Sequence, residues 1–495
     1  MTSHNDPPAS PGLSQAIRDA LEAKCSRLVL EVDGRQWTGR SFLAQANARC
    51  LQLLDAGLIP GDAVLVQSGR GGDFWIDVFA VWACGGVYAP IGDAISLDQA
   101  VRLVQPRFLL GASSTEEVPE GLNFLDGPPA GSAEIILPTI KPPAPDSLST
   151  ILFTSGSTGQ PKGVRLSDGG LLANARATLQ CLDLRPDDVL FAPIAFRFVS
   201  ALSHFVTVML SDATLAATEA PLLPNSLAAS VESNGATCLG GSPIHARWLV
   251  EAEADAFTTL RWIMSSGDNL GSATIASLAT LRPGLGIYTF YGLTELAGRF
   301  CWLAPQEQAT HMGSVGRPIP GFSLVLVDDD NTPCLGNQIG EVIARGPGLM
   351  QGYCGDTQAT DKAIGFGGFR TGDLGYLDDD GLLHLVGRKD DVFKVMGLKA
   401  HAMTIQDAVM ASGLVEDAAV LPFEDDRIGT APCVYLVEGP TKGYSKGAMM
   451  RHLRSALPNH MLPRKFIAVG AIPRTSSGKV DRTALRDLAQ SLEES

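Results

Sequence analysis

The spacing of apolar residues in the first 60 positions predicts two amphipathic helices joined by a hairpin. Apolar side chains recur every three or four residues over 16–21 and again over 41–54, which is the period of one helix face. Between these segments, residues 28–37 read as two short strands around Asp33-Gly34, a dipeptide typical of tight hairpin turns. This part of the chain is therefore expected to fold as helix, hairpin, helix.

The pattern then changes to segments that are apolar at nearly every position. Residues 63–67 predict a buried strand, 74–83 a largely buried helix, and 85–91 a further strand. The alternation of strands and helices resumes from about 189 to 285. Alternation of this kind predicts layered α/β sheets, and the second run indicates a second α/β layer.

The remainder of the chain follows other patterns. Residues 321–328 and 340–346 predict short strands separated by turns, closer to an all-β module. After Arg388 the period changes again, and we expect a small α+β region with a helix near 405–409. Residues 111–146, rich in Pro, Gly, Ser and Glu, predict a connection made mostly of loops. At about 150 residues per domain, the length allows about three folding units.

Composition narrows the possible classes of protein. The chain is 45% hydrophobic, yet no window approaches the ~18 unbroken apolar residues of a membrane-spanning helix. Residues 1–8 lack the basic and apolar segments of a secretory signal. The net charge of −15 argues against nucleic acid or an anionic membrane as a partner. Nine scattered cysteines, with no metal-ligand spacing, favour free thiols in a reducing cytoplasm.

One stretch is rich in groups that bind phosphate. In residues 151–164 (ILFTSGSTGQPKGV), three apolar positions run into a loop of glycines and hydroxyls that closes on Lys162. Glycines let the backbone present its N–H groups, hydroxyls add donors, and lysine adds charge, so the stretch suits a polyphosphate. It differs from the loop of the common nucleotide hydrolases, because Gln160 and Pro161 separate Gly159 from the lysine. Taken alone, it could also be a Ser/Gly-rich surface linker.

Residues 288–295 (YTFYGLTE) place aromatic rings, a glycine turn, a hydroxyl and a carboxylate within one short loop. A ring can stack on a purine, and Thr294 can donate to a phosphate. Glu295 can hold Mg²⁺ directly or through water. The structural alternative for this stretch is a strand end followed by a turn.

Three further stretches carry charged groups on turns. In 369–376 (FRTGDLGY), Asp373 follows a tight turn from which a carboxylate can accept both hydroxyls of a ribose. Residues 387–397 (GRKDDVFKVMG) combine basic and acidic groups, and 473–482 (PRTSSGKVDR) presents Lys479 on a Ser-Ser-Gly loop. Each also has a structural explanation as a turn aspartate, a solvated charged turn or a solvated lysine near the terminus.

In order and spacing, these five stretches resemble the core motifs of the adenylate-forming superfamily, the AMP-dependent synthetases and ligases. This superfamily includes acyl-CoA synthetases, the adenylation domains of peptide synthetases, and luciferases. The resemblance covers roughly residues 37 to 485. It implies an α/β protein whose N-terminal domain, 1–389, has two α/β subdomains and a distorted β-barrel. A small mobile α+β domain, 390–495, would follow.

The resemblance also implies two half-reactions and a role for each motif. A carboxylate and Mg-ATP would give an acyl-adenylate, which a thiol would convert to a thioester and AMP. Lys479 would bridge the carboxylate and the α-phosphate, Glu295 would hold the metal beside Thr294, and Asp390 would be the hinge. The residues expected to bind the nucleotide are Thr154, Ser155, Gly156, Ser157, Thr158, Gly159, Lys162, Gly267, Asp268, Thr289, Phe290, Tyr291, Gly292, Asp373 and Arg388.

The pocket for the acid is less clearly marked. We expect it to be lined by Phe196, Arg197, Ser200, Gly240, Gly241 and Ser266. Arg197 stands where amino-acid-activating members carry an aspartate, and a cation there disfavours an ordinary α-amino acid. Arg197, together with Arg299, could receive a second carboxylate or another acceptor group of the substrate. Alternatively, Arg197 points outward or pairs with a structural acid.

Three functions remain open on the sequence. The first is an AMP-forming acid–thiol ligase that uses ATP, Mg²⁺ and CoA, for which Lys399 and Arg427 are candidate contacts to the CoA 3′-phosphate. The second is a freestanding adenylation enzyme that loads an acyl group or a non-standard amino acid onto the phosphopantetheine of an acyl or peptidyl carrier protein. The third, from another class, is a non-catalytic nucleotide-binding relative.

Overall fold

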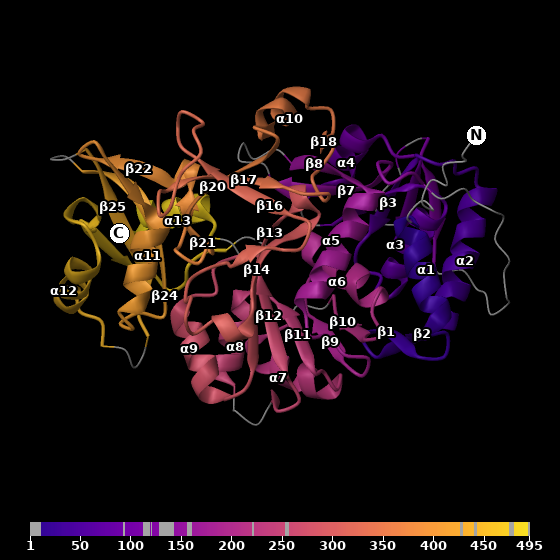
Figure 1. Cartoon of the computed structure of the whole chain (residues 1–495), viewed down its shortest axis with the longest axis horizontal. Coiled ribbons are helices and arrows are strands. Elements are labelled where there is room, and N and C mark those ends of the chain that lie inside the picture. The colour runs from indigo at the N-terminus through magenta and orange to yellow at the C-terminus, as the bar shows by residue number, and fades with distance from the viewer. Residues whose placement is uncertain are drawn as a thin grey trace, which may run out of the picture.

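Two large sheets with helices between them build most of the molecule (Figure 1). The computed structural model describes residues 11–92, 95–111, 119, 121–127, 143–155, 161–219, 222–252, 257–425, 429–439, 443–474 and 480–493. Within these ranges, nine strands form the first sheet, in the order β15 (Arg317–Pro318), β14 (Gly298–Leu303), β13 (Gly286–Leu293), β12 (Trp262–Ser266), β11 (Cys238–Gly241), β9 (Val189–Ala192), β10 (Thr214–Ala217), β1 (Leu28–Val32) and β2 (Arg35–Thr38).

The strands of this sheet that lie between β13 and β1 are parallel to one another, whereas β14 runs antiparallel to β13. Parallel neighbours end at the same edge, so β11, β12 and β13 all finish where β14 begins. Helices α7 (Pro224–Ser233), α8 (Pro243–Glu251) and α9 (Ser272–Leu281) cover the outer face, where Leu227, Leu249 and Leu278 join Ile263 of β12 in one apolar cluster. Ligands of open α/β sheets bind beyond such carboxyl ends.

The second sheet contains the predicted phosphate stretch. In the described residues its seven strands follow the order β18 (Gly352–Tyr353), β8 (Pro161–Ser167), β7 (Leu148–Ser155), β4 (Val87–Ile91), β3 (Ala63–Gln67), β5 (Phe108–Gly111) and β6 (Asn123–Asp126). Helix α4 (Leu97–Val104) packs on its outer face beside Leu65 and Leu109. The strands predicted at 63–67 and 85–91 are thus adjacent and parallel.

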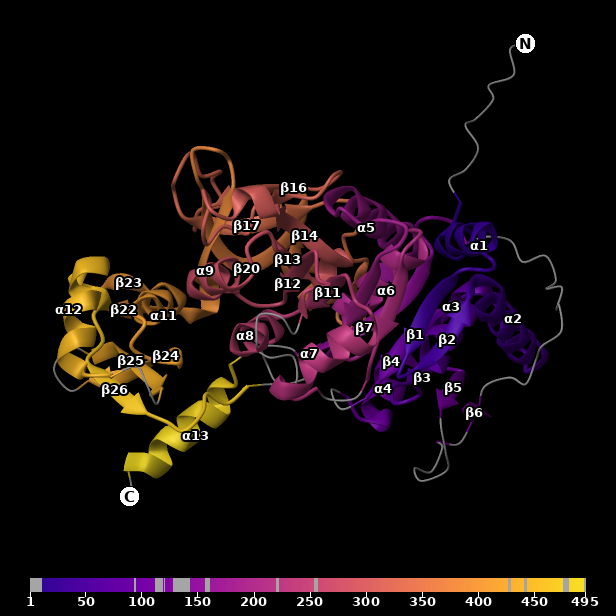
Figure 2. The same ribbon diagram turned by 90° about the horizontal axis from the view of Figure 1, so that it is seen from below.

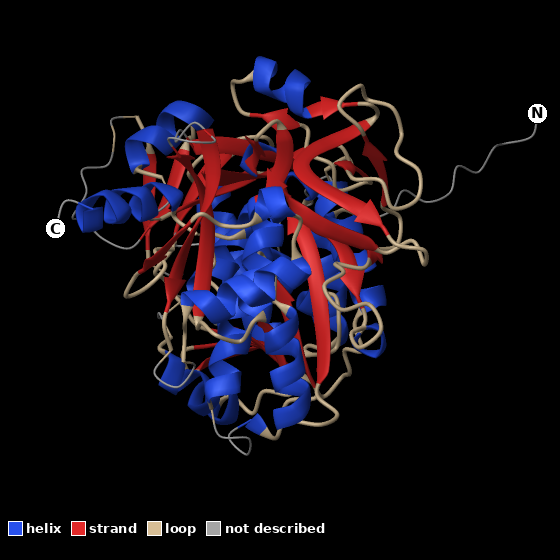
Figure 3. Cartoon of the chain, turned by 90° about the vertical axis from the view of Figure 1, so that its left-hand side faces the viewer, coloured by secondary structure: helices blue, strands red, loops and turns tan. Residues whose placement is uncertain are grey.

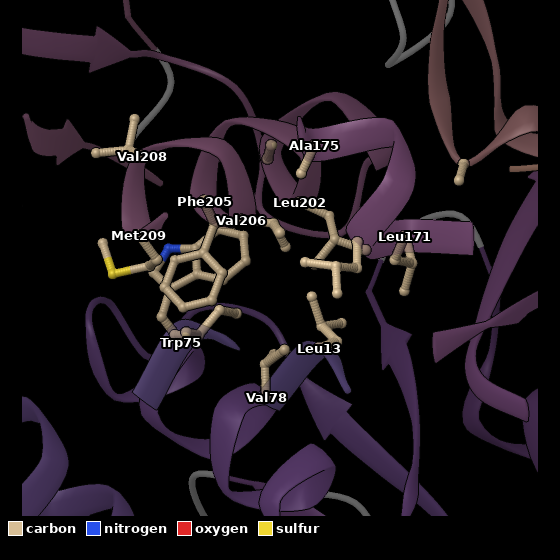
Figure 4. Packing of buried hydrophobic residues seen from close by; sticks show 14 of the residues in the cluster. Leu13, Trp75, Val78, Leu171, Ala175, Leu202, Phe205, Val206, Val208 and Met209 are labelled. Atoms are coloured by element: carbon tan, nitrogen blue, oxygen red, sulfur yellow. The ribbon is translucent and has the colours of Figure 1, made fainter. Parts of the chain in front are cut away.

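A layer of helices packs between the two sheets. Figure 3, coloured by secondary structure, shows helices in the middle of the molecule with strands on both sides. They are α1 (Leu13–Ala23), α2 (Gly39–Asp55), α3 (Asp73–Ala83), α5 (Asp168–Cys181) and α6 (Val199–Met209). Helix α3 is buried on every side, as its continuous apolar run predicts. The rings of Trp75 and Phe205 stack with centroids 4.5 Å apart (Figure 4), which joins α3 to α6.

Asp168, the first residue of α5, is a buried carboxylate (1% exposed) whose Oδ2 accepts the N–H of Leu13 at 2.8 Å. Burial raises its pKa to about 6. The carboxyl group of Asp168 therefore holds its proton more tightly in the folded protein than in the unfolded chain. Its contribution to the free energy of unfolding is complete below about pH 4 and is lost as the pH rises through 6. We expect Asp168→Asn to raise the midpoint of thermal unfolding by a few degrees at pH 8 and to leave it unchanged near pH 4.

A matched control for this substitution is Asp98→Asn, because Asp98 also lies in the first turn of a helix, α4, but is exposed. The difference in unfolding midpoint between Asp98→Asn and the parent protein should be similar at pH 8 and pH 4. A variant at Asp168 that is no more stable than the parent at pH 8 would contradict the assigned cost of the buried charge.

An antiparallel sheet follows the two α/β layers. It contains β16 (Ser323–Val327), β17 (Gly340–Arg345), β20 (Gly368–Leu377), β19 (Ile364–Gly365) and β21 (Leu383–Arg388), with α10 (Thr357–Ala363) beside β19. The all-β module predicted around 321–346 is confirmed. Strand β17 is buried over Gly340–Ala344, whereas β16 begins at an exposed serine and becomes buried only at Leu326 and Val327.

Residues after β21 form a smaller body at one end of the molecule (Figures 1 and 2). A short 3₁₀ turn, η4 (Lys389–Asp391), leads into β22 (Val392–Val395), β23 (Leu398–His401), α11 (Ala402–Ala411), β24 (Asp417–Asp425), β25 (Gly429–Val437), α12 (Lys446–Ala456), β26 (Lys465–Ala468) and α13 (Arg482–Glu493). Its two apolar clusters are built from its own elements, such as Ile405 with Leu453 and Leu421 with Leu485.

The predicted elements and the observed ones agree closely. The helix, hairpin and helix of the first 60 residues, the second α/β run and the helix near 405–409 are all confirmed. The loop-rich connection at 111–146 lies mostly outside the described residues, although β6 falls within it. No helix in the described part of the chain is long and apolar enough to cross a membrane.

Candidate active site

The predicted phosphate loop is the turn of a β-hairpin. Strands β7 and β8 are antiparallel, and their last paired positions are Thr154 with Lys162 and Ser155 with Pro161. Gly156, Ser157, Thr158 and Gly159 lie outside the described residues. The pairing holds the two ends of the loop side by side and fixes Lys162 at its exit.

Strand β18 brings a tyrosine between Lys162 and Glu295. Tyr353 pairs with Val164 of β8, and the missing side chain of the neighbouring residue, Gly163, leaves room for Cys354, because a Cβ there would lie 3.0 Å from its sulfur. The Lys162 ammonium is 4.8 Å from the centre of the Tyr353 ring, and the Tyr353 hydroxyl donates to Glu295 Oε1 at 3.0 Å. Burial and the charge of Glu295 raise the pKa of Tyr353, so its hydroxyl stays a donor. Lys162 and Tyr353 also line a cavity of about 630 Å³.

Thr294 and Glu295 lie on a 3₁₀ turn, η2 (Thr294–Leu296), that reverses the chain from β13 into β14. The turn ends at Ala297 in the left-handed conformation (φ 61°), which costs a residue with a Cβ of order 1 kcal/mol. A Cβ on Gly292 would lie only 1.9 Å from the carbonyl oxygen of Gly298. Gly292 therefore has a steric reason to be glycine, because it lets the antiparallel strands β13 and β14 approach closely next to the turn that carries Glu295.

The structure brings together three of the residues predicted to bind the nucleotide. Arg388 Nη1 donates to Asp373 Oδ1 and to the carbonyl of Thr371, both at 3.0 Å, and the Tyr291 hydroxyl donates to Asp373 Oδ2. Asp373 and Arg388 are also direct partners across β20 and β21. Burial and the Asp373 charge raise the pKa of Tyr291. A carboxylate held on both oxygens is fixed in orientation, yet each oxygen keeps a further lone pair for a ligand.

Two other predicted nucleotide residues have protein partners. The hydroxyl of Thr289 accepts a hydrogen bond from Gln308 Nε2 at 3.0 Å. Phe290 is 2% exposed, and the guanidinium of Arg299 lies 5.6 Å from the centre of its ring. Both side chains therefore help to hold β13 in place in this conformation, and their predicted contacts with the nucleotide stay predictions.

In the predicted acid pocket, Ser266 is joined to two residues from other elements. Its hydroxyl accepts from Arg299 Nη1 at 2.5 Å, and Arg299 Nη2 lies 3.2 Å from His204 Nε2. The missing side chain of Gly240 makes room for the imidazole, because a Cβ there would lie 2.5 Å from His204 Cε1. Gly241 is close to the ring of His245 in the same way, with a Cβ 3.1 Å from Nδ1. Both glycines thus accommodate histidine rings.

The stretch that precedes α6 is divided between core and surface. Phe196 is buried (1% exposed) with its ring 4.9 Å from that of Trp75, so it packs in the core. Arg197 lies over the Phe198 ring at 4.6 Å. Ser200 is half-buried in the first turn of α6. The predicted contacts of Phe196, Arg197 and Ser200 with the acid stay predictions.

Gly267 and Asp268, which follow β12, face the smaller C-terminal body. Arg474 lies 3.9 Å from Asp268 and forms an ion pair with Asp417 at 2.7 Å, and Asn269 donates to Asp407 at 3.3 Å. Lys479 lies outside the described residues, but Arg474 and Val480 on either side of its loop pair as a β-bridge. The base of that loop therefore lies beside the edge where β12 ends.

Two residues of this site escaped the sequence analysis. His204 is a titratable side chain within the apolar run of α6, and that contrast is a signal that could have marked it. Tyr353 follows a glycine on the two-residue strand β18, and no sequence pattern distinguishes it from other surface tyrosines.

The two stacked α/β sheets, the antiparallel sheet and the small C-terminal body are the architecture of adenylate-forming enzymes. Residues 17–354 match the family described as AMP-binding enzyme, and residues 404–479 match its C-terminal domain. The chain belongs to the AMP-binding enzyme family.

Individual relatives show how broad this family is. The chain is 26% identical to tyrocidine synthase 3 of Brevibacillus parabrevis over 97% of its own length, but it spans only 8% of that protein. It is 28% identical to the 2-succinylbenzoate–CoA ligase of Bacillus velezensis over 69% of each chain. The crystal structure of ATP-bound MatB from Rhodopseudomonas palustris superimposes with a TM-score of 0.87 at 23% identity, covering 97% of this chain and 99% of that one.

Proposed function

We propose that this chain activates a carboxylic acid with Mg-ATP as an acyl-adenylate and transfers the acyl group to the thiol of CoA. The observation that carries the proposal is two sets of side-chain contacts whose members on one segment, Tyr291 and Glu295, are four residues apart. One set runs from Lys162 through Tyr353 to Glu295, and the other runs from Tyr291 through Asp373 to Arg388. The first set offers contacts for phosphates and the second offers contacts for a ribose.

In this proposal each group has a task set by its chemistry. Thr154, Lys162 and the loop between them hold the β- and γ-phosphates, and Asp373 accepts the ribose hydroxyls beside Arg388. Thr289 to Thr294, at the end of β13, frame the adenylate. Gly267 and Asp268 border the adenylate at the end of β12. The acid lies near Ser266 and Gly240.

A single half-buried carboxylate is a suitable ligand for Mg²⁺ when the remaining positions are filled by phosphate oxygens and water. Glu295 fits this role, because its Oε1 is oriented by the Tyr353 hydroxyl while the described residues place no cation against it. When bound, the metal supplies neutralisation of charge on the departing pyrophosphate. Lys479 complements it by bridging the carboxylate and the α-phosphate. The carboxylate oxygen bonds to the α-phosphorus as the bond to pyrophosphate breaks.

The proposal divides the chain into residues 1–389 and 390–495, with the hinge at Asp390. This residue lies in η4, between two elements that belong to different bodies, and its own side chain is exposed. Hinges are commonly short segments at the ends of elements that absorb a change in backbone angles. A turn there would withdraw Lys479 after the first step and open the site to the thiol.

Free CoA is the proposed acceptor because named relatives, including the 2-succinylbenzoate ligase, are CoA ligases. The alignment with tyrocidine synthase 3 favours a second candidate, transfer to the phosphopantetheine of a carrier protein. Lys399, a possible contact for the CoA 3′-phosphate, pairs with Asp329 at 2.7 Å in this conformation, and Arg427 lies outside the described residues.

The test is ATP–pyrophosphate exchange over a panel of carboxylic acids, followed by thioester formation with the acid that exchanges best. Free CoA and a phosphopantetheinylated carrier protein are compared as acceptors. We expect exchange that depends on both the acid and Mg²⁺, and then a faster reaction with CoA. Exchange with no acid would overturn the activity and favour a non-catalytic nucleotide-binding protein. Reaction with the carrier protein alone would overturn only the acceptor.

A further inference from the structure

Arg299, near the start of β14, is a buried cation whose hydrogen bonds all go to neutral groups. The side chain is 3% exposed, and it donates from Nη1 to the Ser266 hydroxyl and from Nη2 to His204 Nε2. Its Nε is buried and makes no hydrogen bond within the described part of the chain. A guanidinium has five N–H donors, so this one retains donors that are shielded from water and available to an acceptor.

No carboxylate of the described residues forms an ion pair with Arg299. The contrast with Arg49 is direct, since Arg49 is also fully buried but has Asp77 at 2.7 Å from its Nε. Burying a charge without a partner costs several kcal/mol, and proteins normally supply a counter-ion. Burial lowers the pKa of Arg299 to about 10, which still leaves it cationic at neutral pH. The positive charge is thus left uncompensated within the described protein.

His204 does not supply the missing charge. Burial, and then the charge of Arg299, lower its pKa well below the ordinary value, so the imidazole is neutral. Because Nε2 faces an arginine N–H, it is the acceptor, and the ring proton is on Nδ1. Gly240 leaves the space that the ring occupies. The imidazole therefore positions the guanidinium without neutralising it.

The position of this cation matches the part of the site where the acid must lie. Arg299 is paired across the sheet with Gly292, three residues before Glu295. Ser266, which holds its Nη1, is followed by the exposed Gly267, where a Cβ would meet nothing within 4 Å. The guanidinium thus lies beside the last residues of β12 and β13, close to the sheet edge at which these strands end. An acid whose activated carboxylate faces the nucleotide would direct its other end into the sheet edge.

We propose that Arg299 selects the substrate by binding a second carboxylate at the end of the acid remote from the one that is activated. The inference rests on the proposed acid activation and narrows it to dicarboxylic acids. Carboxylates match the fork of a guanidinium, and a charge-assisted pair in a water-poor site is stronger than a neutral hydrogen bond. The second carboxylate supplies the counter-ion that the described protein lacks and takes the free Nε–H.

Arg197 has different neighbours from Arg299. Its guanidinium lies over the ring of Phe198, and its Cδ is 3.2 Å from the position a Cβ of Gly92 would take, at the end of the other sheet. The sequence suggested both arginines as receivers of a second carboxylate. The contacts with Ser266 and His204 single out Arg299.

The experiment compares dicarboxylic acids with their own monoamides, which have nearly the same size and shape but lack the second charge. Succinate and succinamate, glutarate and glutaramate, and phthalate and phthalamate are assayed by ATP–pyrophosphate exchange. A hydrogen bond to a charged group is worth about 1.5–3 kcal/mol. We therefore expect kcat/KM to favour the better diacid over its monoamide by ~10- to 100-fold.

Arg299→Gln removes the charge and keeps a polar, though shorter, side chain. It should lower kcat/KM for the diacid by ~10- to 100-fold, mainly through KM, and leave the monoamide within a few-fold of its original value. Arg317→Gln, at an exposed position of the neighbouring strand β15, is the matched control and should change neither substrate. If the glutamine variant does not fold, Arg299→Lys keeps the charge but loses the fork and should show an intermediate preference.

The outcomes separate this inference from the function on which it rests. Exchange with monoamides as efficient as with diacids, or a preference that survives in the glutamine variant, would overturn the role of Arg299 while leaving acid activation intact. Exchange with no acid at all, charged or neutral, would instead overturn the proposed function and the inference with it. Thermal stabilisation of the wild-type protein with AMP by the diacid but not by its monoamide would support the inference without relying on turnover.

Discussion

Replacing Lys479 with alanine should nearly abolish acyl-adenylate formation and leave the second half-reaction almost unchanged. The first step brings an anionic carboxylate against an anionic phosphate, and a cation between them acts most strongly as charge develops on the oxygens. Removing a single donor of this kind typically costs ~10²–10³ in rate, and a full charge should cost at least as much. ATP–pyrophosphate exchange measures the loss directly.

The second half-reaction provides the internal comparison for Lys479→Ala. Supplied with chemically prepared acyl-adenylate, the variant should form the thioester at nearly the parental rate. In this step the thiol attacks the acyl carbon of a carboxyl group that is already bonded to AMP, so the lysine is not needed to bring a free carboxylate against a phosphate. Lys446→Ala is the matched control, since Lys446 is exposed on α12 of the same C-terminal body. Equal losses in both half-reactions would show that the lysine acts on folding or docking and not on the charge of the first step.

The second large effect is expected for Glu295→Gln. The substitution keeps the shape of the side chain and the acceptor for Tyr353, but removes the negative charge proposed to hold Mg²⁺. Exchange should fall by ~10²–10³-fold at ordinary magnesium and should require much higher magnesium for half-maximal rate. The measurement is the exchange rate over a titration of MgCl₂ at fixed ATP.

Tyr353→Phe distinguishes the carboxylate from the group that orients it. Loss of the hydroxyl leaves the charge of Glu295 in place, so the expected decrease is smaller, about tenfold, as is typical when a partner of a metal ligand is removed. A glutamine variant with a normal magnesium dependence would remove Glu295 from the proposed metal site. A phenylalanine variant as impaired as the glutamine variant would assign the main role to Tyr353.

The sequence predicted the elements well because their signals are local. The apolar run of α3 and the hydroxyl- and glycine-rich segment between β7 and β8 are each contained in fewer than fifteen residues. Motif order was also informative, since Tyr291, Asp373 and Arg388, three residues that the resemblance assigns to the nucleotide, contact one another in the structure. Here local pattern and tertiary structure agree.

What the sequence could not show are contacts between distant segments. His204 and Arg299 are 95 residues apart, and Glu295 and Tyr353 are 58 apart. Whether an arginine has a counter-ion depends on which side chains surround it after folding, and no spacing rule encodes that. Likewise, the sequence does not show that the space beside Gly240 holds the imidazole of His204.

The anchoring of β21 has a mechanical consequence. Arg388 ends that strand, tied to Thr371 and Asp373 of β20, and Lys389 holds Glu341 at 3.2 Å. The backbone is thus pinned immediately before Asp390. Any rearrangement that keeps these ties must be a swivel about this fixed pivot and not a sliding of one body along the other. The C-terminal body can rotate and turn a different surface toward the rest of the molecule, but its point of attachment stays within a few ångströms of Asp373, the carboxylate proposed above to bind the ribose.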